Sequence, residues 1–502
     1  MTDPLIIFEE PELEFRYKQK VNTPHDGLSL LGPYDADHAG ILGLSYISIG
    51  TGEGLDLLDE WCSVVNKPAI VEDKEGKGAD LRLWPPYPGF ETAFNVRWPE
   101  KPIWERAINS TDLSEASRLH DPYQRTDSVV KYYLDEIELA AQKLDQTPGV
   151  CICIVPDEIY KNCRPQSKVS EYTGEKTSKK TIKSRKSGQL ELFSNVEVDV
   201  YNSSPDFRRQ LKAKSMKFGI PLQIIRESTL KLQDDFKRGE RSLTPISDRM
   251  WNLSTAFYYK CGGKPWRLVK AREGVCYVGI AFRRADDGRT ACCAAQMFLD
   301  DGDGIVFLGE FGPWYSPEKQ QFRLTSEAAF NLLSGTLKTY ADLGGKELNE
   351  VFLHSRSNIS KEEFSGYKKA CPKGVKITGI RVRRESRDGF RLYRSHKMPV
   401  LRGSFLKNSE TSGFLWATGF KPRLAAYDGW EVPVPLRIDI QHGDASIERV
   451  AQDIFGLTKL NYNACRLGES QPVTVKFSDA VGEILVSNPS VSDFKNNFKY
   501  YI

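Results

Sequence analysis

The 502-residue sequence has no long apolar run, few histidines and almost no net charge. No stretch approaches the roughly 18 consecutive apolar residues that span a bilayer, so a transmembrane segment is not expected. The N-terminal letters MTDPLIIFEEPELEF are acidic and lack the basic start of a signal peptide. These absences predict a cytoplasmic protein with no membrane partner.

Metal-binding and disulfide patterns are also missing. The ten cysteines form no Cys-x-x-Cys pair, and the six histidines are scattered, so no zinc spacing is present. Cys151 and Cys153 alternate inside one apolar segment, and Cys292 and Cys293 lie in another. Such positions suit cysteine as a small buried hydrophobe in a reducing compartment.

The length and composition are those of an ordinary globular protein with several domains. A chain of 502 residues suggests two to four domains at roughly 150 residues each. Hydrophobic residues make up 40% and charged residues 27%, which excludes collagen-like, coiled-coil and disordered classes. A sizeable hydrophobic core is therefore expected.

Basic residues are concentrated in two blocks although the formal net charge is only +3. The block from Lys161 to Lys186 has nine Lys and Arg against two Glu, and the block from Lys373 to Arg402 has ten against two acids. Phe390 and Tyr393 lie inside the second block, where aromatic rings could stack on bases. The blocks predict one positively charged groove for a nucleic acid, with solvated charge runs as the alternative.

The first half of the chain alternates between strand and helix patterns. The apolar run Val150–Val155, ended by Pro156, is typical of a buried parallel strand. Ser204-Pro205-Asp206 has the residues that begin a helix, and the strand Pro221–Ile225 follows it. With further strand and helix patterns at 42–49, 55–65, 128–143 and 251–260, this order predicts an open α/β domain with a parallel sheet up to about residue 265.

The pattern changes after Lys264-Pro265-Trp266. Three strands joined by tight turns are expected first, and Ala285-Asp286-Asp287-Gly288 is the first of these turns. Helix, strand, helix and strand then follow, giving strands at 275–284, 289–299, 305–310, 350–354 and 375–381 with helices at 326–342 and from 361. This order is typical of a ribonuclease H-like domain.

An open α/β domain followed by a ribonuclease H-like domain resembles the MID and PIWI halves of an Argonaute. The segments that carry the resemblance are Gly32-Pro33-Tyr34, Tyr87-Pro88-Gly89-Phe90, Ile220-Pro221-Leu222-Gln223-Ile224-Ile225-Arg226-Glu227-Ser228-Thr229, Gly262-Gly263-Lys264-Pro265-Trp266 and Lys459-Leu460-Asn461-Tyr462-Asn463. The resemblance covers essentially the whole chain and is strongest to short prokaryotic Argonautes. It implies an α/β fold, with an open Rossmann-like MID domain and its lead-in segment at 1–265 and a ribonuclease H-like PIWI domain at 266–502.

The resemblance also implies a pocket for the 5′-phosphate of a guide strand. Argonautes use a four-residue pattern, which falls here on Arg208, Lys212, Gln223 and Lys260. Arg208 and Lys212 are four residues apart on the predicted helix and therefore project from one face. Cations and an amide around a terminal phosphate give charge-assisted hydrogen bonds. A solvated helix face is the alternative for the first two residues.

A divalent cation is implied beside the first guide phosphates. In many prokaryotic Argonautes the C-terminal carboxylate helps to bind it. The last residues, Phe498-Lys499-Tyr500-Tyr501-Ile502, are largely apolar, as expected for a buried terminus. The Ile502 carboxylate is therefore the predicted ligand of Mg²⁺ at the guide 5′ end.

The nuclease site of the resembled family lacks its carboxylates here. Ala281 lies where the first aspartate belongs, and His354-Ser355-Arg356 lacks the aspartate of the fourth strand. The last ligand position holds an asparagine, and the acids of the first turn lie too far along the strand to substitute; these residues are Asn461 or Asn463 and Asp286 and Asp287. Because two-metal hydrolysis needs these ligands, we expect no catalytic residues and no enzymatic cleavage.

The function implied is guide-directed recognition without cutting. A 5′-phosphorylated guide, expected to be RNA, would pair with complementary single-stranded target DNA, so that base pairing reads the sequence. Short Argonautes form heterodimers with an APAZ-containing effector protein, which can be a TIR or sirtuin-like NAD⁺ hydrolase or a nuclease. Target binding would then activate the effector in plasmid or phage defence by death of the infected cell. An active guided nuclease and an unguided single-strand binder are the alternatives.

Overall fold

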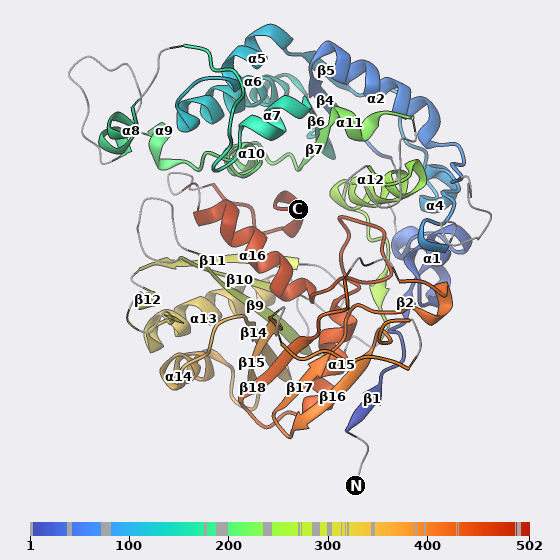
Figure 1. The fold of residues 1–502 in the computed structure, drawn as a ribbon, viewed down its shortest axis with the longest axis vertical. Coiled ribbons are helices and arrows are strands. Elements are labelled where there is room, and N and C mark those ends of the chain that lie inside the picture. The colour runs from blue at the N-terminus through green and yellow to red at the C-terminus, as the bar shows by residue number, and fades with distance from the viewer. Residues whose placement is uncertain are drawn as a thin grey trace.

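The fold is taken from a computed structural model of the chain. It describes residues 4–37, 43–71, 82–174, 178–186, 199–233, 243–269, 272, 274–283, 292–298, 304–312, 314–316, 318, 321–342, 347–386, 389–395, 398–427, 429, 431–486, 488 and 493–502. Two α/β units lie one above the other, and the C-terminus lies between them (Figure 1).

The upper unit is built on a four-stranded parallel sheet of order β5-β4-β6-β7. Its central strand β6 is the apolar run VCICIV, and all six of its residues are buried, as a strand covered on both faces requires. β7 forms one edge of this sheet. The four strands are β4 (Tyr46–Gly50), β5 (Trp104–Ala107), β6 (Val150–Val155) and β7 (Leu222–Arg226).

Helices cover both faces of this sheet. The 22-residue helix α6 begins where the Asp121 side chain accepts hydrogen bonds from the N–H groups of Tyr123 and Gln124. In the same way Asp206 caps α10 by accepting from the Arg209 N–H. The helices of this unit are α1 (Pro24–Leu30), α2 (Gly52–Val65), α4 (Phe90–Phe94), α5 (Ser110–Ser117), α6 (Pro122–Lys143), α7 (Asp157–Asn162), α8 (Lys179–Lys186), α9 (Asp199–Asn202), α10 (Phe207–Ser215), α11 (Glu227–Leu230) and α12 (Ile246–Lys260).

The lower unit is built on a nine-stranded mixed sheet of order β1-β16-β17-β18-β15-β14-β9-β10-β11. β14 runs parallel to both β9 and β15, and the other neighbours are antiparallel. The strands are β1 (Leu5–Ile7), β9 (Val275–Arg283), β10 (Cys292–Phe298), β11 (Gly304–Phe311), β14 (Glu350–Ser355), β15 (Lys376–Arg384), β16 (Ser404–Ser409), β17 (Ser412–Leu415) and β18 (Leu436–His442).

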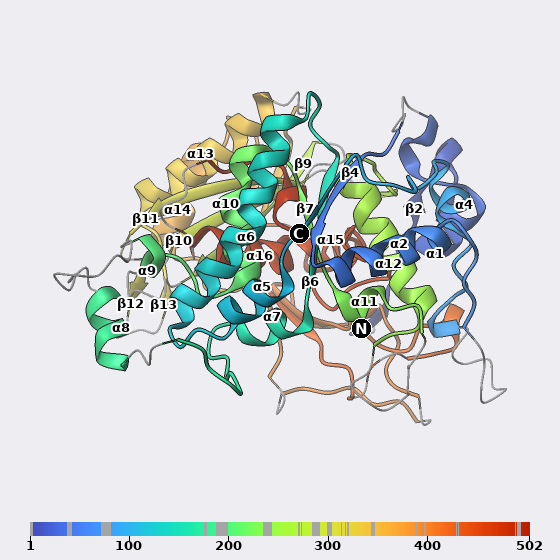
Figure 2. The same ribbon diagram turned by 90° about the horizontal axis from the view of Figure 1, so that it is seen from above.

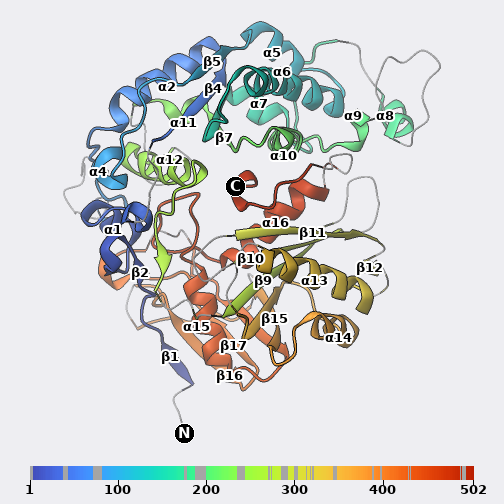
Figure 3. The same cartoon turned by 180° about the vertical axis from the view of Figure 1, so that it is seen from behind.

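The two faces of β9 contribute to different cores. Cys276, Val278 and Ile280 pack with α13 (Ser326–Asp342) and α14 (Lys361–Ala370), whereas Val275 and Tyr277 belong to the core formed with α15 (Ile447–Leu457) and α16 (Val473–Val486). This alternation follows from the period of two in a strand. α16 therefore lies between the large sheet and the upper unit (Figures 1 and 3).

The N-terminal segment contacts both units. In the upper unit, the Tyr258 hydroxyl of α12 donates to Asp35 at 2.7 Å. β1 pairs with β16 of the large sheet, and β2 (Leu13–Glu14) joins β3 (Lys20–Val21) and β8 (Arg267–Leu268) in a small sheet. Between them, the Glu10 carboxylate accepts hydrogen bonds from the buried Arg402 and from Lys459 at 2.8 Å. The lead-in segment is thus bound to the ribonuclease H-like unit as well, and the division at residue 265 stays a prediction.

The fold class predicted from the sequence is confirmed in both units. Two features differ in detail. α10 begins at Phe207 rather than at Ser204, because the Asp206 side chain and not the serine caps its first turn. The large sheet also extends beyond β15 through the unpredicted strands β16 to β18. Within the described part of the chain, no helix is long and apolar enough to cross a membrane.

Candidate nucleic-acid interface

The four residues predicted to hold a guide phosphate lie together at the β7 edge of the parallel sheet. Arg208 and Lys212 come from α10, Gln223 from β7 and Lys260 from the end of α12. The C-terminal residues complete the group, and the C-terminus lies beside β7, α10 and α12 (Figures 1 and 2). The sequence spacing therefore produces one cluster, although binding of a phosphate there stays a prediction.

The two α10 residues contact the C-terminus directly. The buried Lys212 donates from Nζ to the main-chain oxygen of Ile502, and Nη2 of the exposed Arg208 donates to the Tyr501 oxygen at 3.3 Å. Tyr500 adds a hydrogen bond from its hydroxyl to the Gly219 oxygen at 3.0 Å. The last residues thus place an anionic oxygen against a buried ammonium group.

Gln223 and Lys260 form the other side of the cluster. Lys260 is buried and donates from Nζ to the Gln223 side-chain oxygen. The Gln223 oxygen accepts from Lys260, and the amide N–H groups of Gln223 can donate to an anion. The pair therefore offers an ammonium group and an amide donor at the open edge of the sheet.

The cluster is strongly electropositive. Burial lowers the pKa of Lys212 well below its usual value, and the neighbouring Lys260 and Arg208 lower it further. Burial and Arg208 likewise lower the pKa of Lys260 to about 7. Cations that depress one another's pKa values in a buried site are stabilised by a bound anion. The arrangement therefore suits a phosphate group.

The residues at this pocket supply one carboxylate ligand for a magnesium ion. Mg²⁺ is commonly held by one or two carboxylates together with substrate phosphates and waters. Ile502 is buried and offers one such carboxylate, whose oxygen already accepts from Lys212. Among the described residues, no group of three or more His, Cys, Asp and Glu side chains could hold a metal ion. A one-carboxylate site completed by phosphates is the arrangement that the chain could supply.

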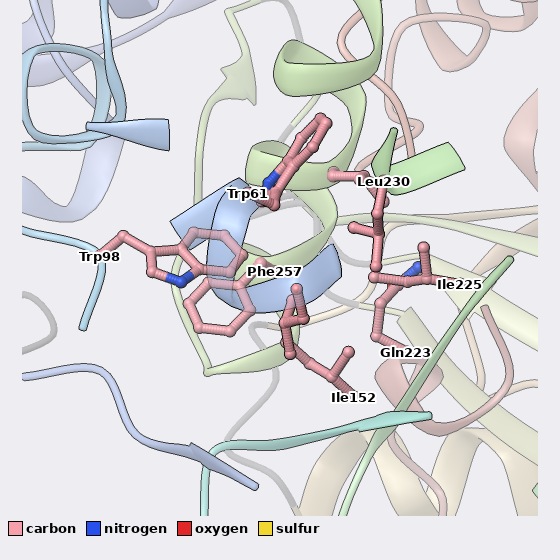
Figure 4. Close-up of a pocket in the computed structure, with 9 residues that line it drawn as sticks. Trp61, Trp98, Ile152, Gln223, Ile225, Leu230 and Phe257 are labelled. Carbon is pink, nitrogen blue, oxygen red and sulfur yellow. The ribbon is translucent and has the colours of Figure 1, made fainter. Parts of the chain in front are cut away.

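A small apolar cavity lies on the inner side of Gln223. It is lined by side chains that include Trp61, Trp98, Ile152 and Phe257 (Figure 4). Its volume of about 10 Å³ is no more than one water molecule needs. Gln223 thus separates the cation cluster from the hydrophobic core, and this cavity has no space for a nucleobase.

Ala281, which was expected to replace the first aspartate of a nuclease site, lies on the face of β9 that α16 covers. Two residues earlier, Gly279 is so close to α16 that an added Cβ would lie 1.9 Å from the Thr474 oxygen. On β14, His354 Nδ1 makes a 2.9 Å hydrogen bond with Thr474 Oγ1, and burial lowers the pKa of His354 to about 3. His354 is therefore a neutral side chain of the α16 packing at physiological pH.

Charged side chains beside Ala281 form a group that the sequence analysis did not predict, which we call the arginine cluster. It consists of Arg209, Arg283, Arg356, Asp479 and Glu483. Arg283 Nη2 lies 2.9 Å from Glu483 and 3.5 Å from Asp479, Arg209 Nη2 lies 2.9 Å from Glu483, and Arg356 pairs with Asp479. The available signal was the four-residue spacing of Asp479 and Glu483, which puts both on one face of a helix.

The other sequence candidates lie elsewhere. Asn461 donates from its side chain to Glu469 and accepts from the Asn463 N–H at 3.0 Å. Asp286 and Asp287 lie outside the described residues. Asn461 is therefore engaged in hydrogen bonds with Glu469 and Asn463.

The two basic blocks lie on different units. The first includes α8, and the second includes β15 and the segment that follows it. Phe390 packs against Phe414 with ring centroids 5.3 Å apart, whereas Tyr393 is 72% exposed. A single groove that joins the blocks stays a prediction.

Comparisons with known proteins identify the fold. No family model matches the sequence, and no curated protein matches it. Solved structures do match. Clostridium butyricum Argonaute bound to a guide DNA and a 19-mer target DNA is 15% identical with a TM-score of 0.60, over 97% of this chain and 53% of that one. Drosophila Piwi is 13% identical with a TM-score of 0.58, over 99% and 56%.

Aquifex aeolicus Argonaute is also similar, with 15% identity and a TM-score of 0.55 over 95% of this chain and 52% of that one. The chain thus has an Argonaute-like fold and spans about half the length of these structures. The predicted pairing of a MID-like unit with a ribonuclease H-like unit agrees with this fold.

Proposed function

We propose that this chain anchors the 5′-phosphorylated end of a guide strand, expected to be RNA, and presents the guide for pairing with complementary single-stranded DNA. The observation that carries this proposal is the convergence of Arg208, Lys212, Gln223 and Lys260 at one sheet edge. These side chains supply three positive charges and an amide, which matches a terminal phosphate dianion.

Each side chain has a separate role in this proposal. Lys212 and Lys260 are buried and provide ammonium groups that a bound phosphate keeps protonated, while the exposed Arg208 presents a guanidinium at the mouth of the pocket. Gln223, held through its oxygen by Lys260, donates an amide N–H to the phosphate. Because a guanidinium has a planar fork of donors, Arg208 can bind two phosphate oxygens at once.

Mg²⁺ belongs to this proposal, with the Ile502 carboxylate as its ligand. The ion would supply positive charge that neutralises the first guide phosphates. The chain's own contribution is to hold the Ile502 oxygen in place through Lys212 and the buried Tyr501. Arg208, which donates to the Tyr501 oxygen, then orients the same segment.

We propose further that the target is bound without being cut. Ala281 offers no oxygen ligand for a metal ion, and the nearest carboxylates of α16 are paired with arginines. The residues beside Ala281 therefore do not fit a two-metal site.

Recognition without cleavage would need an effector in trans, for which an APAZ-containing TIR, sirtuin-like or nuclease partner in a heterodimer is the expected form. Plasmid or phage defence through death of the infected cell, in the cytoplasm, is the role that this assembly would serve.

The test compares guides that differ only at their 5′ end. The wild-type chain should bind a 5′-phosphorylated guide more tightly than its 5′-hydroxyl form, and Lys212→Ala should remove about 10- to 100-fold of that preference, the range for a charge-assisted hydrogen bond. Lys214→Ala is the matched control, because Lys214 lies on the same helix but pairs with Asp127 at 2.6 Å. Equal affinity of the wild type for both guides would reject the proposal.

An unguided single-strand binder is the second candidate. The exposed Tyr393 lies between Arg391 and Arg394, a combination suited to base stacking and phosphate contact. Such a protein would bind single strands without regard to their 5′ end, and Tyr393→Ala would weaken it more than Lys212→Ala. The comparison of guides therefore separates the two functions.

A further inference from the structure

The arginine cluster surrounds the position of the missing first carboxylate. Arg283 follows Ala281 by two residues on β9 and points to the same face, at about 7 Å along the strand. Arg356 directly follows Ser355, which pairs with Ile280 in the parallel register of β14 and β9. Arg356 is therefore level with Ala281 on the neighbouring strand, and the two arginines flank it.

The cluster carries an uncompensated positive charge. Its three guanidinium groups face two carboxylates, those of Asp479 and Glu483. Asp479 is shared by Arg283 and Arg356, and Glu483 is shared by Arg209 and Arg283. One further negative charge would balance the group.

The guanidinium groups of Arg283 and Arg356 are also accessible to a ligand. Nε of Arg283 is itself buried and has no hydrogen-bond partner among the described residues, so a ligand would contact the terminal nitrogens. The side chains of Arg283 and Arg356 are 33% and 45% exposed, so a ligand can reach them from the solvent. Arg356 is further held by Gln471, which accepts from Nη2 at 2.7 Å. The arginines are thus fixed in place but not saturated.

The cluster lies next to the guide pocket along the chain and in space. Arg209 of the cluster adjoins Arg208 of the pocket on α10. Glu483 on α16 connects Arg209 to Arg283, and α16 fills the space between the two units (Figure 3). A nucleic acid anchored at the pocket would therefore lie close to the cluster.

We propose that the arginine cluster binds a phosphodiester group of the strand that is paired with the guide. This inference rests on the proposed function and assigns its target-strand site. A two-metal nuclease attracts the phosphodiester group with metal ions that carboxylates hold. Here Arg283 and Arg356 supply the positive charge instead, and their planar donor groups match phosphate oxygens. The site then holds the target rather than cutting it.

The experiment measures affinity for a complementary DNA strand with the guide-loaded full-length chain between 50 and 300 mM salt. Arg283→Gln and Arg356→Gln should each lower target affinity about 5- to 20-fold and reduce the salt slope by about one. Arg267→Gln and Arg106→Gln are matched controls, because these arginines are 34% and 46% exposed and each pairs with one glutamate away from the cluster. Both controls should bind the target as the wild type does.

A second pair of variants guards against misfolding. Arg356→Lys keeps the positive charge but loses the planar donor group of the guanidinium. It should therefore weaken target binding without changing the salt slope. The double change Arg356→Gln with Asp479→Asn removes both partners and leaves no buried carboxylate unpaired, and it should still lose target affinity. Unchanged target affinity and salt slope in all folded arginine variants would overturn the proposal.

Guide loading is measured separately with a labelled guide. Its 5′-phosphate preference should be the same in the wild type and in every arginine variant. A wild type without that preference would reject the proposed function, and the variants would then be compared on the single strand alone. There, unchanged affinity overturns the cluster as a phosphate site, and a matching loss of affinity supports it without a guide.

Discussion

Lys260 is a buried lysine whose pKa of about 7 lies far below its usual value. The groups that face it are Arg208 and Lys212 from α10, Gln223 from β7, and the thiols of Cys153 and Cys261. Because the folded pKa is lower than the unfolded one, the protonated lysine destabilises the free protein below pH 7. That penalty is relieved as the pH rises from 7 to about 10.4.

The free protein favours neutral Lys260, whereas a bound phosphate favours protonated Lys260 because of its negative charge. Guide binding should therefore take up a proton above pH 7, and affinity for a 5′-phosphorylated guide should fall between pH 7 and 9, by up to about tenfold per unit for each proton. The phosphate itself is already a dianion in this range. Binding titrations across this range, with a 5′-hydroxyl guide as the control, measure the effect.

Lys260→Arg keeps the charge at every pH in the range and should give a shallower profile. A profile of Lys260→Arg as steep as that of the wild type would show that another group takes up the proton.

The helix α16 is the element on which both candidate sites depend. Its first turn packs on β9 at Gly279, and Asp479 and Glu483 on the same helix hold the arginine cluster. Asn488, just beyond it, donates to the Arg209 oxygen on α10 at 3.3 Å. Displacement of α16 would therefore disturb the large sheet and the guide pocket together.

Gly279→Ala should displace α16, since the new Cβ would lie 1.9 Å from the backbone oxygen of Thr474. Overpacking of this kind costs about 1–3 kcal/mol, so the thermal unfolding midpoint should fall by several degrees. Guide affinity should fall with it. Gly52→Ala is the control, because nothing lies within 4 Å of its Cβ position in α2, and it should be neutral or slightly stabilising. A normal midpoint for Gly279→Ala would contradict this account of the packing.

For the molecule as a whole, the expected outcome is target binding without cleavage. The purified chain, loaded with a phosphorylated guide, should leave a complementary strand intact with Mg²⁺ or Mn²⁺, because Ala281 supplies no metal ligand. Gel analysis of an end-labelled target measures this. Guide-dependent cleavage that Lys212→Ala abolishes would contradict the prediction, whereas cleavage that survives Lys212→Ala comes from a contaminant.

Sequencing of the nucleic acid that copurifies with the chain also tests the function of the whole protein. Short 5′-phosphorylated RNAs of uniform length are the guides that the proposed function expects, and a copurified neighbouring protein would identify the effector class. Heterogeneous fragments would instead favour the unguided binder.

Local sequence patterns determined the order and type of most elements, whereas the four residues of the proposed pocket were chosen by the resemblance to Argonautes. The continuous apolar run of β6 specifies a strand buried on both faces, and the four-residue spacing of Arg208 and Lys212 puts both on one helix face. Periodicity, capping and turn residues act over a few positions, so they are readable without knowledge of the fold. The absence of a carboxylate at Ala281 is likewise a property of the sequence.

Only the tertiary structure decided which distant residues meet. Lys212 contacts Ile502 across 290 positions, and Arg402 contacts Glu10 across 392. The arginine cluster joins α10, β9, α16 and the residue that follows β14, which lie far apart in the sequence. Such contacts depend on how the sheets stack and how α16 packs between them, and the free energy of burying those surfaces depends on the whole chain rather than on neighbouring residues.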